Sequence, residues 1–486
     1  MTLSDNTAPC LFWFREDLRL TDNPALHAAI ESGQPLICLF LYDETSEGGW
    51  GAGGARKWWL HHSLQSLKKD IEALGGQLIF QAGTCETLIP GIVEKTEATH
   101  VYWTRRYSPS QIEIDKQIKA TLEGKGISVT SMNGRLLHEP WHFKTGGGQS
   151  YRVFTPLWKA MKARGTVRQA IKSANSMSWA QHSLQSLELE ELDLLPTSPN
   201  WAADFSSQWQ PGEAGARQRL ARFISEAAAH YRDARNRPDK LGTSGLSPHL
   251  QHGEISPIQI WHAIKFAVDA GDIPFDQADV FLSEIAWREF SYVLLFHNPD
   301  MLAKEINPKF SNFPWHQDSA KLKAWQSGKT GYPIVDAGMR ELWKTGWMHN
   351  RVRMIVGSFL VKHLLINWRD GMAWFWDTLL DADIGANTAS WQWIAGCGAD
   401  AAPYFRIFNP MLQGAKFDPN GDYIRRFVPE LEKLPTKYLN EPWEAPKAIL
   451  QEAGIDLGDN YPHPIVDHKK ARDLALAAYQ KTKPPL

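Results

Sequence analysis

The first stretch of about 130 residues alternates short apolar runs with amphipathic helical segments. Leucine and isoleucine recur at helical spacing across residues 60–74, until Gly75-Gly76 ends the helix. Asn23 followed by Pro24 has the order expected at the start of another helix. Strands that alternate with helices predict an α/β domain, a doubly wound, Rossmann-like parallel sheet with helices on both faces. The strands are expected at residues 11–14, 36–42, 77–80, 101–103 and 127–130.

The pattern changes after this stretch. Gly146-Gly147-Gly148 and the Pro/Ser/Asn run at 196–200 are typical of surface connections and predict an interdomain linker. Beyond them helical periodicity, over ranges such as 279–296 and 338–365, predicts an all-α second domain. A chain of 486 residues exceeds the size at which single cores stop growing, so two domains are expected. The expected boundaries are 1–132 for the α/β domain, 133–205 for the linker and 206–486 for the helical domain.

Composition limits the classes of partner. A net charge of −2 gives no overall attraction to nucleic acid, so any DNA affinity must come from a local basic face. The four cysteines have no CxxC or zinc-type spacing, which predicts structural thiols and no metal site. No long uncharged apolar run is present, and the first residues lack a signal-peptide pattern. We therefore expect a soluble, cytoplasmic monomer without membrane contacts.

Two tryptophans and an arginine cluster in residues 391–410, WQWIAGCGADAAPYFRIFNP, shortly after an acidic turn. The turn holds Asp381, Asp383 and Asn387, and such a set is unusual in an ordinary hydrophobic core. This stretch resembles the flavin pocket of the DNA photolyase/cryptochrome family. The resemblance extends along nearly the whole chain, from LFWFREDLRL at 11–20 to the basic tail, HKKAR. It implies non-covalent FAD in the helical domain.

Residues 243–248, TSGLSP, offer hydroxyls and backbone amides in a turn that opens onto a helix. Donors at a helix N-terminus form a natural phosphate cradle, although a plain Ser/Thr helix cap gives the same pattern. The absence of a G-x-G-x-x-G after the first strand excludes a standard dinucleotide fingerprint in the first domain. The resemblance implies that the FAD phosphates bind to this turn.

Arg353 shares one helix face with Asn350 and Met354. A buried guanidinium needs an anionic partner, and the Asp381/Asp383 turn is the obvious candidate. The resemblance implies that the Arg353 and Asp381 pair covers the isoalloxazine edge, while Asp383 accepts a hydrogen bond from the ring. The implied cofactor-binding residues are Tyr231, Thr243, Ser244, Gly245, Leu246, Ser247, Phe281, Arg288, Asn350, Arg353, Asp381, Ala382, Asp383 and Asn387.

Glu284, Trp287 and Arg288 fall at i, i+3 and i+4 and so point the same way from one helix. A core ion pair with a packed tryptophan would give the same pattern. The resemblance implies instead a cavity in which Trp287 and Trp393 flank a flipped-out dimer and Glu284 hydrogen-bonds its bases. Flipping costs roughly a few kcal/mol, and stacking returns about 1–3 kcal/mol per base. The implied DNA- and lesion-binding residues are Glu284, Trp287, Arg288, Asn350, Arg351, Trp393, Arg406 and Gln413, and the implied catalytic residues are Glu284, Asn350 and Met354.

Particular positions separate the members of the family. Asn387 can accept a hydrogen bond from flavin N5, whereas plant-type cryptochromes carry aspartate at the matching position. Photolyases for (6-4) photoproducts carry histidines where this chain has Asn350 and Met354, so cyclobutane dimers are favoured. Phe281 stands where many repair enzymes have tryptophan, and it keeps an aromatic wall. The electron-transfer chain of the family is matched by Trp391, Trp368 and Trp315.

The resemblance also implies a second, antenna chromophore in the N-terminal domain. The usual folate pocket carries Asn-Glu after the fourth strand, but this chain has Ser110 and Gln111 there. The runs WWLHH at 58–62 and NTASW at 387–391 resemble the class III branch, which uses folate at another site. Methenyltetrahydrofolate is therefore favoured over deazaflavin.

The implied function is that of a deoxyribodipyrimidine photo-lyase. Such an enzyme repairs cyclobutane pyrimidine dimers in UV-damaged DNA, by light-driven electron transfer from reduced FAD to a flipped-out dimer. The main alternative is a cryptochrome-type blue-light photoreceptor, with FAD and no repair activity, although no long tail follows the last expected helix. A flavin electron-transfer protein that never meets DNA is a third possibility, which preferential binding of dimer-containing DNA in the dark would exclude.

Overall fold

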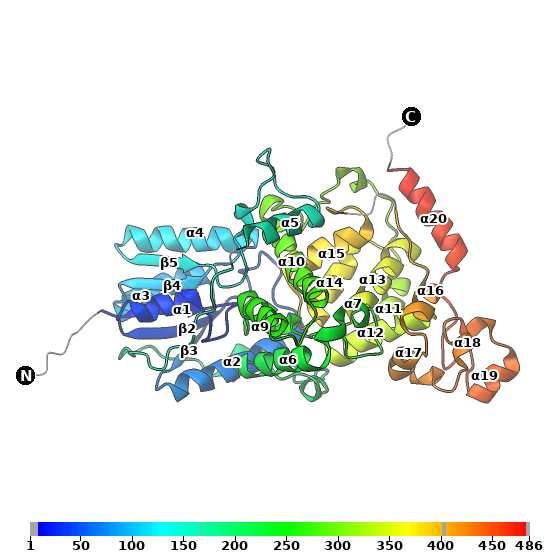
Figure 1. Ribbon diagram of the computed structural model, residues 1–486, viewed down its shortest axis with the longest axis horizontal. Helices are drawn as coiled ribbons and strands as arrows, with labels where there is room; N and C mark the ends of the chain where they lie inside the picture. Colours follow the sequence, from blue (N-terminus) through cyan, green and yellow to red (C-terminus); the bar gives the residue numbers. More distant parts are fainter. Residues whose placement is uncertain (1–7, 166, 401–404, 483–486) are drawn as a thin grey trace, which may run out of the picture.

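The computed structural model describes residues 8–165, 167–400 and 405–482. Figure 1 shows a sheet with its helices at one end of the molecule and a larger helical part at the other. The described strands pair in parallel, in the order β3-β2-β1-β4-β5. The predicted α/β domain is confirmed. Its strands are β1 Cys10–Phe14, β2 Leu36–Tyr42, β3 Leu78–Ala82, β4 His100–Thr104 and β5 Ser128–Met132.

Helices cover both faces of the sheet because its central strands are apolar on both sides. Every side chain of β1 is buried: Phe12 packs toward α1 and α2, and Trp13 packs toward α3 and α4. Asn23 begins α1, as its position before a proline predicts, and its side chain accepts a hydrogen bond from the Leu26 N–H at 3.2 Å. These helices are α1 Pro24–Glu31, α2 Gly54–Ala73, α3 Cys85–Thr96 and α4 Pro109–Gly124.

The rest of the described chain after β5 holds helices and isolated bridges but no strand. Its centre is the long helix α10, which packs against α15, α9, α7 and α5. The helices are α5 Phe154–Arg164, α6 Glu213–Glu226, α7 Tyr231–Ala234, α8 Ser247–Gln251, α9 Pro257–Asp269, α10 Phe275–His297, α11 Ser319–Gln326, α12 Pro333–Thr345, α13 Asn350–Ser358, α14 Trp368–Thr378, α15 Ile384–Ala395, α16 Pro410–Phe417, α17 Asp422–Phe427, α18 Thr436–Leu439, α19 Lys447–Ala453 and α20 His468–Gln480.

The range of helical periodicity over 338–365 does not form one continuous helix. The chain leaves α12 at Gly346, re-enters helix at α13, and continues into a π-helical turn at Phe359–His363. Gly346 has a φ of +67°, and a Cβ at this position would lie 2.6 Å from Leu380 Cγ. The break therefore requires glycine, both for its backbone conformation and for the close approach of Leu380.

Residues 133–205 contain α5 and contact both parts of the molecule. Leu137 and Leu157 are buried in the core around α10, whereas Leu189 and Leu192 are buried against the sheet. This stretch therefore contributes core residues on both sides. The domain boundaries expected from the sequence stay predictions.

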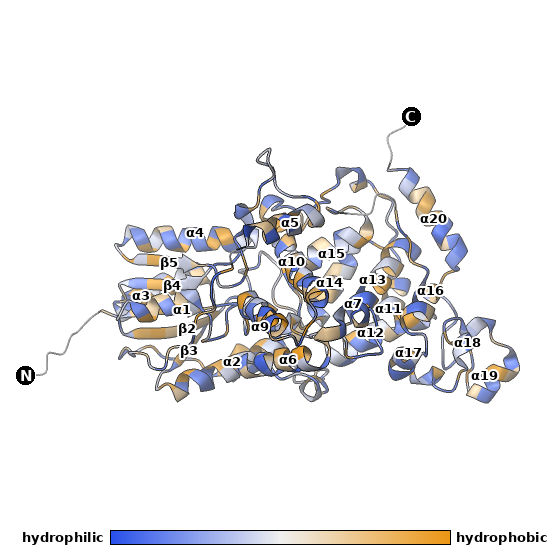
Figure 2. Ribbon diagram, viewed as in Figure 1, coloured by the Kyte–Doolittle hydropathy of each residue, from blue (hydrophilic) through white to orange (hydrophobic). Residues whose placement is uncertain are grey.

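Hydropathy follows the fold. Figure 2 shows largely hydrophobic strands in the sheet and helices, such as α4, that alternate between hydrophilic and hydrophobic residues. All four cysteines are buried and free of disulfide bonds, as expected of structural thiols. Among the described helices, none is long and apolar enough to cross a membrane.

Candidate functional site

The acidic turn at Asp381 is where the predicted flavin-binding groups meet. Arg353 on α13 donates to Asp381 Oδ2 at 2.9 Å, and the Ser247 hydroxyl donates to the same oxygen at 2.5 Å. Trp347 Nε1 in turn donates to Ser247 Oγ at 3.3 Å. Asp381 is buried, and its other oxygen, Oδ1, has no hydrogen-bond partner among the described residues. Since a buried carboxylate oxygen needs a donor, the turn is suited to receive a polar group from a ligand.

Asp383 and Asn387 lie at the first turn of α15. Asp383 Oδ1 accepts from the Ala386 N–H at 2.8 Å, and its Oδ2 accepts from the Tyr292 hydroxyl at 2.5 Å. Asn387 Nδ2 donates to the Met372 carbonyl at 3.0 Å, which fixes the amide and leaves its oxygen as an acceptor. Both predicted ring-facing residues are therefore held in one orientation by neighbours.

The predicted phosphate loop, residues 243–247, leads into α8. Gly245 has a φ of +61°, and a Cβ at this position would lie 2.5 Å from Arg219 Nη1. Ser244 Oγ accepts from the Leu246 N–H at 3.3 Å. Hydroxyls, backbone amides and a guanidinium thus gather at one turn, which suits an anion such as a diphosphate.

An aromatic cluster lies between this loop and α10. Tyr231 and Phe281 are buried and meet edge to face, with ring centroids 5.1 Å apart. Phe223 packs against both rings, at 5.6 Å from Tyr231 and 4.5 Å from Phe281. The structure therefore brings these two predicted cofactor-binding residues together. Two further predicted residues are buried: Leu246 in the loop and Ala382 in the acidic turn.

Glu284 forms an ion pair with Arg235, the residue that follows α7, at 2.5 Å. Burial raises the pKa of Glu284, and the Arg235 charge opposes that rise. Arg288 lies one turn further along α10, and it donates to the Arg135 carbonyl at 2.8 Å. Its guanidinium also lies 5.2 Å from the ring centroid of Tyr292. The two charged residues of this motif therefore bind different partners rather than each other.

Trp287 and Trp393 are joined through two further residues. Trp287 stacks on Phe154, the first residue of α5, with ring centroids 3.8 Å apart and planes at 9°. Phe154 N–H donates to Asp400 Oδ2 at 3.4 Å, and the Asp400 carbonyl accepts from Trp393 Nε1 at 3.0 Å. This arrangement sets one indole relative to the other. Residues 401–404 of the motif lie outside the described residues.

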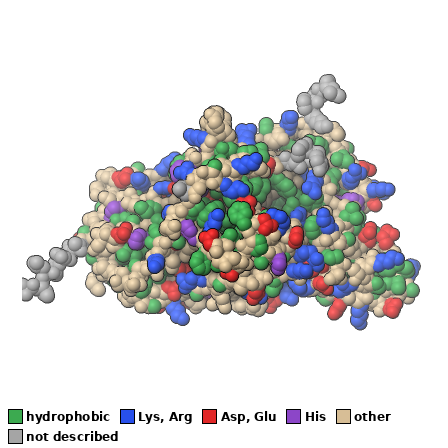
Figure 3. Space-filling model, in the orientation of Figure 1, with side chains coloured by type: hydrophobic (Ala, Val, Ile, Leu, Met, Phe, Trp, Pro, Cys, Tyr) green, Lys and Arg blue, Asp and Glu red, His purple; other side chains and the backbone are tan. Residues whose placement is uncertain are grey.

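Arg351 is a half-buried cation on this side of the site. It donates to Asn236 Oδ1 at 2.6 Å, and its guanidinium lies 4.5 Å from the ring centroid of Phe417. Figure 3 shows a hollow in the middle of the molecular surface, lined by hydrophobic side chains, with Lys and Arg side chains around it. A local basic margin is what a chain of net charge −2 needs for binding DNA. The remaining predicted residues of this face are half-buried or exposed: Asn350, Met354, Arg406 and Gln413.

The three tryptophans of the predicted electron path lie on α14 and its neighbours. Trp391 is buried against α14, where a Cβ on Gly371 would lie 2.2 Å from its ring. Trp368 begins the same helix and is fully buried. Trp315 is half-buried. The next residue, His316, forms a backbone bridge with Ile366, which lies two residues before Trp368. Trp391 and Trp368 are thus both buried and Trp315 is half-buried, and the electron path through them stays a prediction.

Sequence reasoning missed several residues of the site. Arg235, Arg135 and Phe154 come from segments distant in sequence, and no local pattern indicates their partners. Tyr292 is different, because it follows Arg288 by one helical turn on α10. Helical spacing could have shown that Tyr292 shares this face.

Comparisons with known proteins bear on this geometry. Residues 10–174 match the family model described as DNA photolyase, and residues 281–481 match the FAD binding domain of DNA photolyase. The deoxyribodipyrimidine photo-lyase of Agrobacterium fabrum is 50% identical over 481 residues, which cover 99% of each chain. The chain belongs to the DNA photolyase family. The family expected from the sequence is therefore confirmed.

Other relatives of this photolyase-family chain include a cryptochrome and a solved photolyase structure. Cryptochrome-1 of Arabidopsis thaliana is 38% identical over 474 residues, covering 95% of this chain and 69% of that protein. The crystal structure of a bacterial class III photolyase from Agrobacterium tumefaciens superposes with a TM-score of 0.95, at 50% identity and 99% coverage of each chain. The match to the FAD binding domain of DNA photolyase, over residues 281–481, lies in the helical part of the molecule. It contains Arg353, Asp381 and Asn387.

Proposed function

We propose that this chain is a deoxyribodipyrimidine photo-lyase that repairs cyclobutane pyrimidine dimers in DNA under light. The observation that carries the proposal is the linked pair of indoles, Trp287 and Trp393, beside a carboxylate and a basic margin. Trp287 is backed by Phe154 at 3.8 Å, so only one of its faces is free to stack on a base. Two indoles linked in this way suit a flipped-out dimer, whose bases stack on aromatic planes.

FAD is proposed to bind between the phosphate loop and the acidic turn. Reduced FAD, when bound and excited by light, supplies the electron that splits the dimer. The residues proposed to hold it fit its chemistry: a cradle for anionic phosphates, a buried acceptor at Asp381 Oδ1, and an acceptor at Asn387 Oδ1. Tyr231, Phe281 and Ala382 supply apolar walls, and Arg353 balances the charge of Asp381.

The protein groups around the lesion are proposed to position it and to stabilise charge. Glu284, which Arg235 holds in an ion pair, hydrogen-bonds the dimer bases, and Glu284 and Asn350 stabilise the charge that develops on the dimer. Arg351, Arg406 and Gln413 contact backbone phosphates, which positions the strand without reading its sequence. Trp391, Trp368 and Trp315 carry electrons to the flavin from the surface. The protein is proposed to act as a cytoplasmic monomer on UV-damaged DNA.

An antenna chromophore is proposed for the N-terminal domain, with methenyltetrahydrofolate favoured. Arg15 and Arg106 follow the carboxyl ends of β1 and β4, and their Nε atoms are buried without partners among the described residues. Both arginines pair with Asp115 of α4, whose Oδ2 is likewise buried without a partner. The crevice at this edge of a doubly wound sheet is the usual ligand position. Acid extraction and the fluorescence excitation spectrum of the purified protein test this proposal, and a protein whose only chromophore is FAD contradicts it.

Repair of an oligonucleotide with one cyclobutane thymine dimer tests the main proposal. Purified, chemically reduced protein should restore intact thymines under blue or near-UV light and not in the dark. If FAD is present and photoreducible but no thymine is restored, the protein is a photoreceptor of the cryptochrome type.

Glu284→Ala should lower the repair yield about tenfold while FAD stays bound, as for the loss of one charge-assisted hydrogen bond of about 1.5 kcal/mol. Glu430→Ala is a matched control, because Glu430 pairs with Arg340 at 2.8 Å and is 29% exposed, against 28% for Glu284. Full repair by the Glu284→Ala variant would contradict the assigned role.

A further inference from the structure

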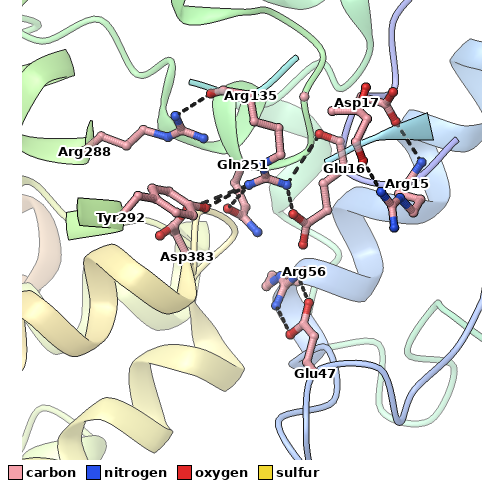
Figure 4. A network of polar contacts seen from close by, with 12 residues as sticks. Arg15, Glu16, Asp17, Glu47, Arg56, Arg135, Gln251, Arg288, Tyr292 and Asp383 are labelled. Carbon is pink, nitrogen blue, oxygen red and sulfur yellow. Dashed lines mark hydrogen bonds and ion pairs between the residues drawn. The ribbon is translucent and has the colours of Figure 1, made fainter. Parts of the chain in front are cut away.

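A buried arginine links the sheet domain to the carboxylate of Asp383 (Figure 4). Arg135 follows β5, and its side chain is 2% exposed. Its guanidinium donates to the Tyr292 hydroxyl at 3.1 Å and lies 3.9 Å from Asp383 Oδ2. On its other side it pairs with Glu16, which follows β1. Arg135 therefore stands between one carboxylate from each part of the molecule.

The hydrogen bonds of this network run in one direction. Arg135 donates to the Tyr292 oxygen, so the Tyr292 proton is free to point at Asp383 Oδ2, which it meets at 2.5 Å. Asp383 Oδ1 is occupied by the Ala386 N–H at 2.8 Å. With one donor on each oxygen, the carboxylate cannot rotate without losing a bond, and its remaining lone pairs keep one orientation.

The network is itself fixed in place. Arg288 donates to the Arg135 carbonyl at 2.8 Å, and Gln251 accepts from Arg135 at 3.4 Å. Arg56 is a further cation in this region, but Glu47 already pairs with both of its terminal nitrogens at 3.1 Å. Arg135 therefore supplies the positive charge that lies directly against Asp383.

We propose that Arg135 and Tyr292 are positioning residues for the flavin, acting through Asp383. The proposal rests on the proposed function, in which Asp383 accepts a hydrogen bond from the flavin ring. Tyr292 orients the carboxylate, and Arg135 offsets its negative charge. Both effects favour the reduced flavin, because reduction adds negative charge beside Asp383. Since Glu16 pairs with Arg135, the sheet domain takes part in setting the reactivity of a cofactor bound in the helical domain.

Tyr292→Phe tests the orienting role, since it removes the hydroxyl and keeps the ring. The midpoint potential of the bound FAD should fall, with the ratio of reduced to oxidised flavin at a fixed potential about tenfold lower, equal to about 30 mV for a two-electron couple. Tyr107→Phe is the matched control, because Tyr107 is buried and donates to Glu139 at 2.9 Å, with its ring 5.8 Å from that of Tyr292. Equal potentials in the two variants would overturn the orienting role of Tyr292.

Arg135→Met should lower the potential in the same direction, and Arg135→Lys should restore most of it because the charge is kept. FAD content, measured after heat release, shows whether a variant still binds the cofactor, and a variant that fails to fold leaves Arg135→Lys and Tyr292→Phe to decide. A wild-type protein that does not repair dimers refutes the proposed function, and the potentials still test the role of Arg135. If both Arg135→Met and Tyr292→Phe keep the wild-type potential, the positioning role is refuted whatever the repair result.

Discussion

Gly371→Ala should destabilise the protein, although alanine is the better helix former. Gly371 lies inside α14, and its added Cβ would fall 2.2 Å from Cη2 of Trp391, far inside normal van der Waals contact. The indole is 3% exposed and is packed against Phe375 at 5.0 Å and Trp325 at 6.2 Å. Overpacking of this kind costs about 1–3 kcal/mol, against a gain of about 1 kcal/mol in helix propensity. We expect a net loss of about 1 kcal/mol.

Gly357→Ala provides the matched control. Gly357 lies on α13 and also touches Trp391, but its added Cβ would sit 3.6 Å from Cζ3 of the indole, an ordinary contact. This variant should gain about 0.5–1 kcal/mol in stability. Urea unfolding followed by circular dichroism measures both, and flavin photoreduction should slow only in Gly371→Ala, in which the indole is displaced. A Gly371→Ala protein as stable as Gly357→Ala would refute the packing argument.

Other predictions concern titration and the first turn of α15. Burial raises the pKa of Glu341 to about 7 from about 4.5, so the folded protein holds a proton that the unfolded chain releases between these pH values. The resulting stability is complete below about pH 4.5 and is lost as the pH rises to about 7. Glu341→Gln should remove this part of the pH dependence. In urea unfolding, its free energies of unfolding at pH 5 and pH 7.5 should differ less than those of the wild type, because each pH unit between the two pKa values contributes about 1.4 kcal/mol. Asn387→Asp should lose about 1–3 kcal/mol of stability, because a carboxylate cannot donate to the Met372 carbonyl at 3.0 Å and repels it. Unchanged unfolding of Asn387→Asp would show that the Met372 contact contributes nothing.

The spacing of apolar residues along the chain is sufficient to predict the fold class. The β2 strand occupies the predicted residues 36–42, because a run of seven apolar or aromatic residues between turns has few alternatives. The helix break at Gly346 could not be seen in the same way, since glycine is tolerated inside helices and its need here arises from Leu380. That contact joins residues 34 positions apart, which no periodicity reports.

The need of a buried charge for a partner is sufficient to predict one ion pair of the site. A guanidinium on an otherwise apolar face predicts an acid nearby, and Arg353 and Asp381 are 2.9 Å apart. The partner of Glu284 was beyond this reasoning, because Arg288 on the same helix is an equally good candidate until the fold places Arg235 opposite. Arg135 was hidden for another reason: it lies in a stretch whose glycines and prolines predict a surface connection, yet it is buried.

The stretch between the two parts limits how this protein can be modular. A fragment that ends at residue 132 omits Arg135, and with it the cation between Glu16 and Asp383. A fragment that starts at residue 206 omits Phe154, which backs Trp287. Each fragment therefore lacks a residue of 133–205 that its own side chains contact. An exchange of N-terminal domains between relatives should therefore succeed only when the contact residues of 133–205 fit the surfaces of both parts that they join.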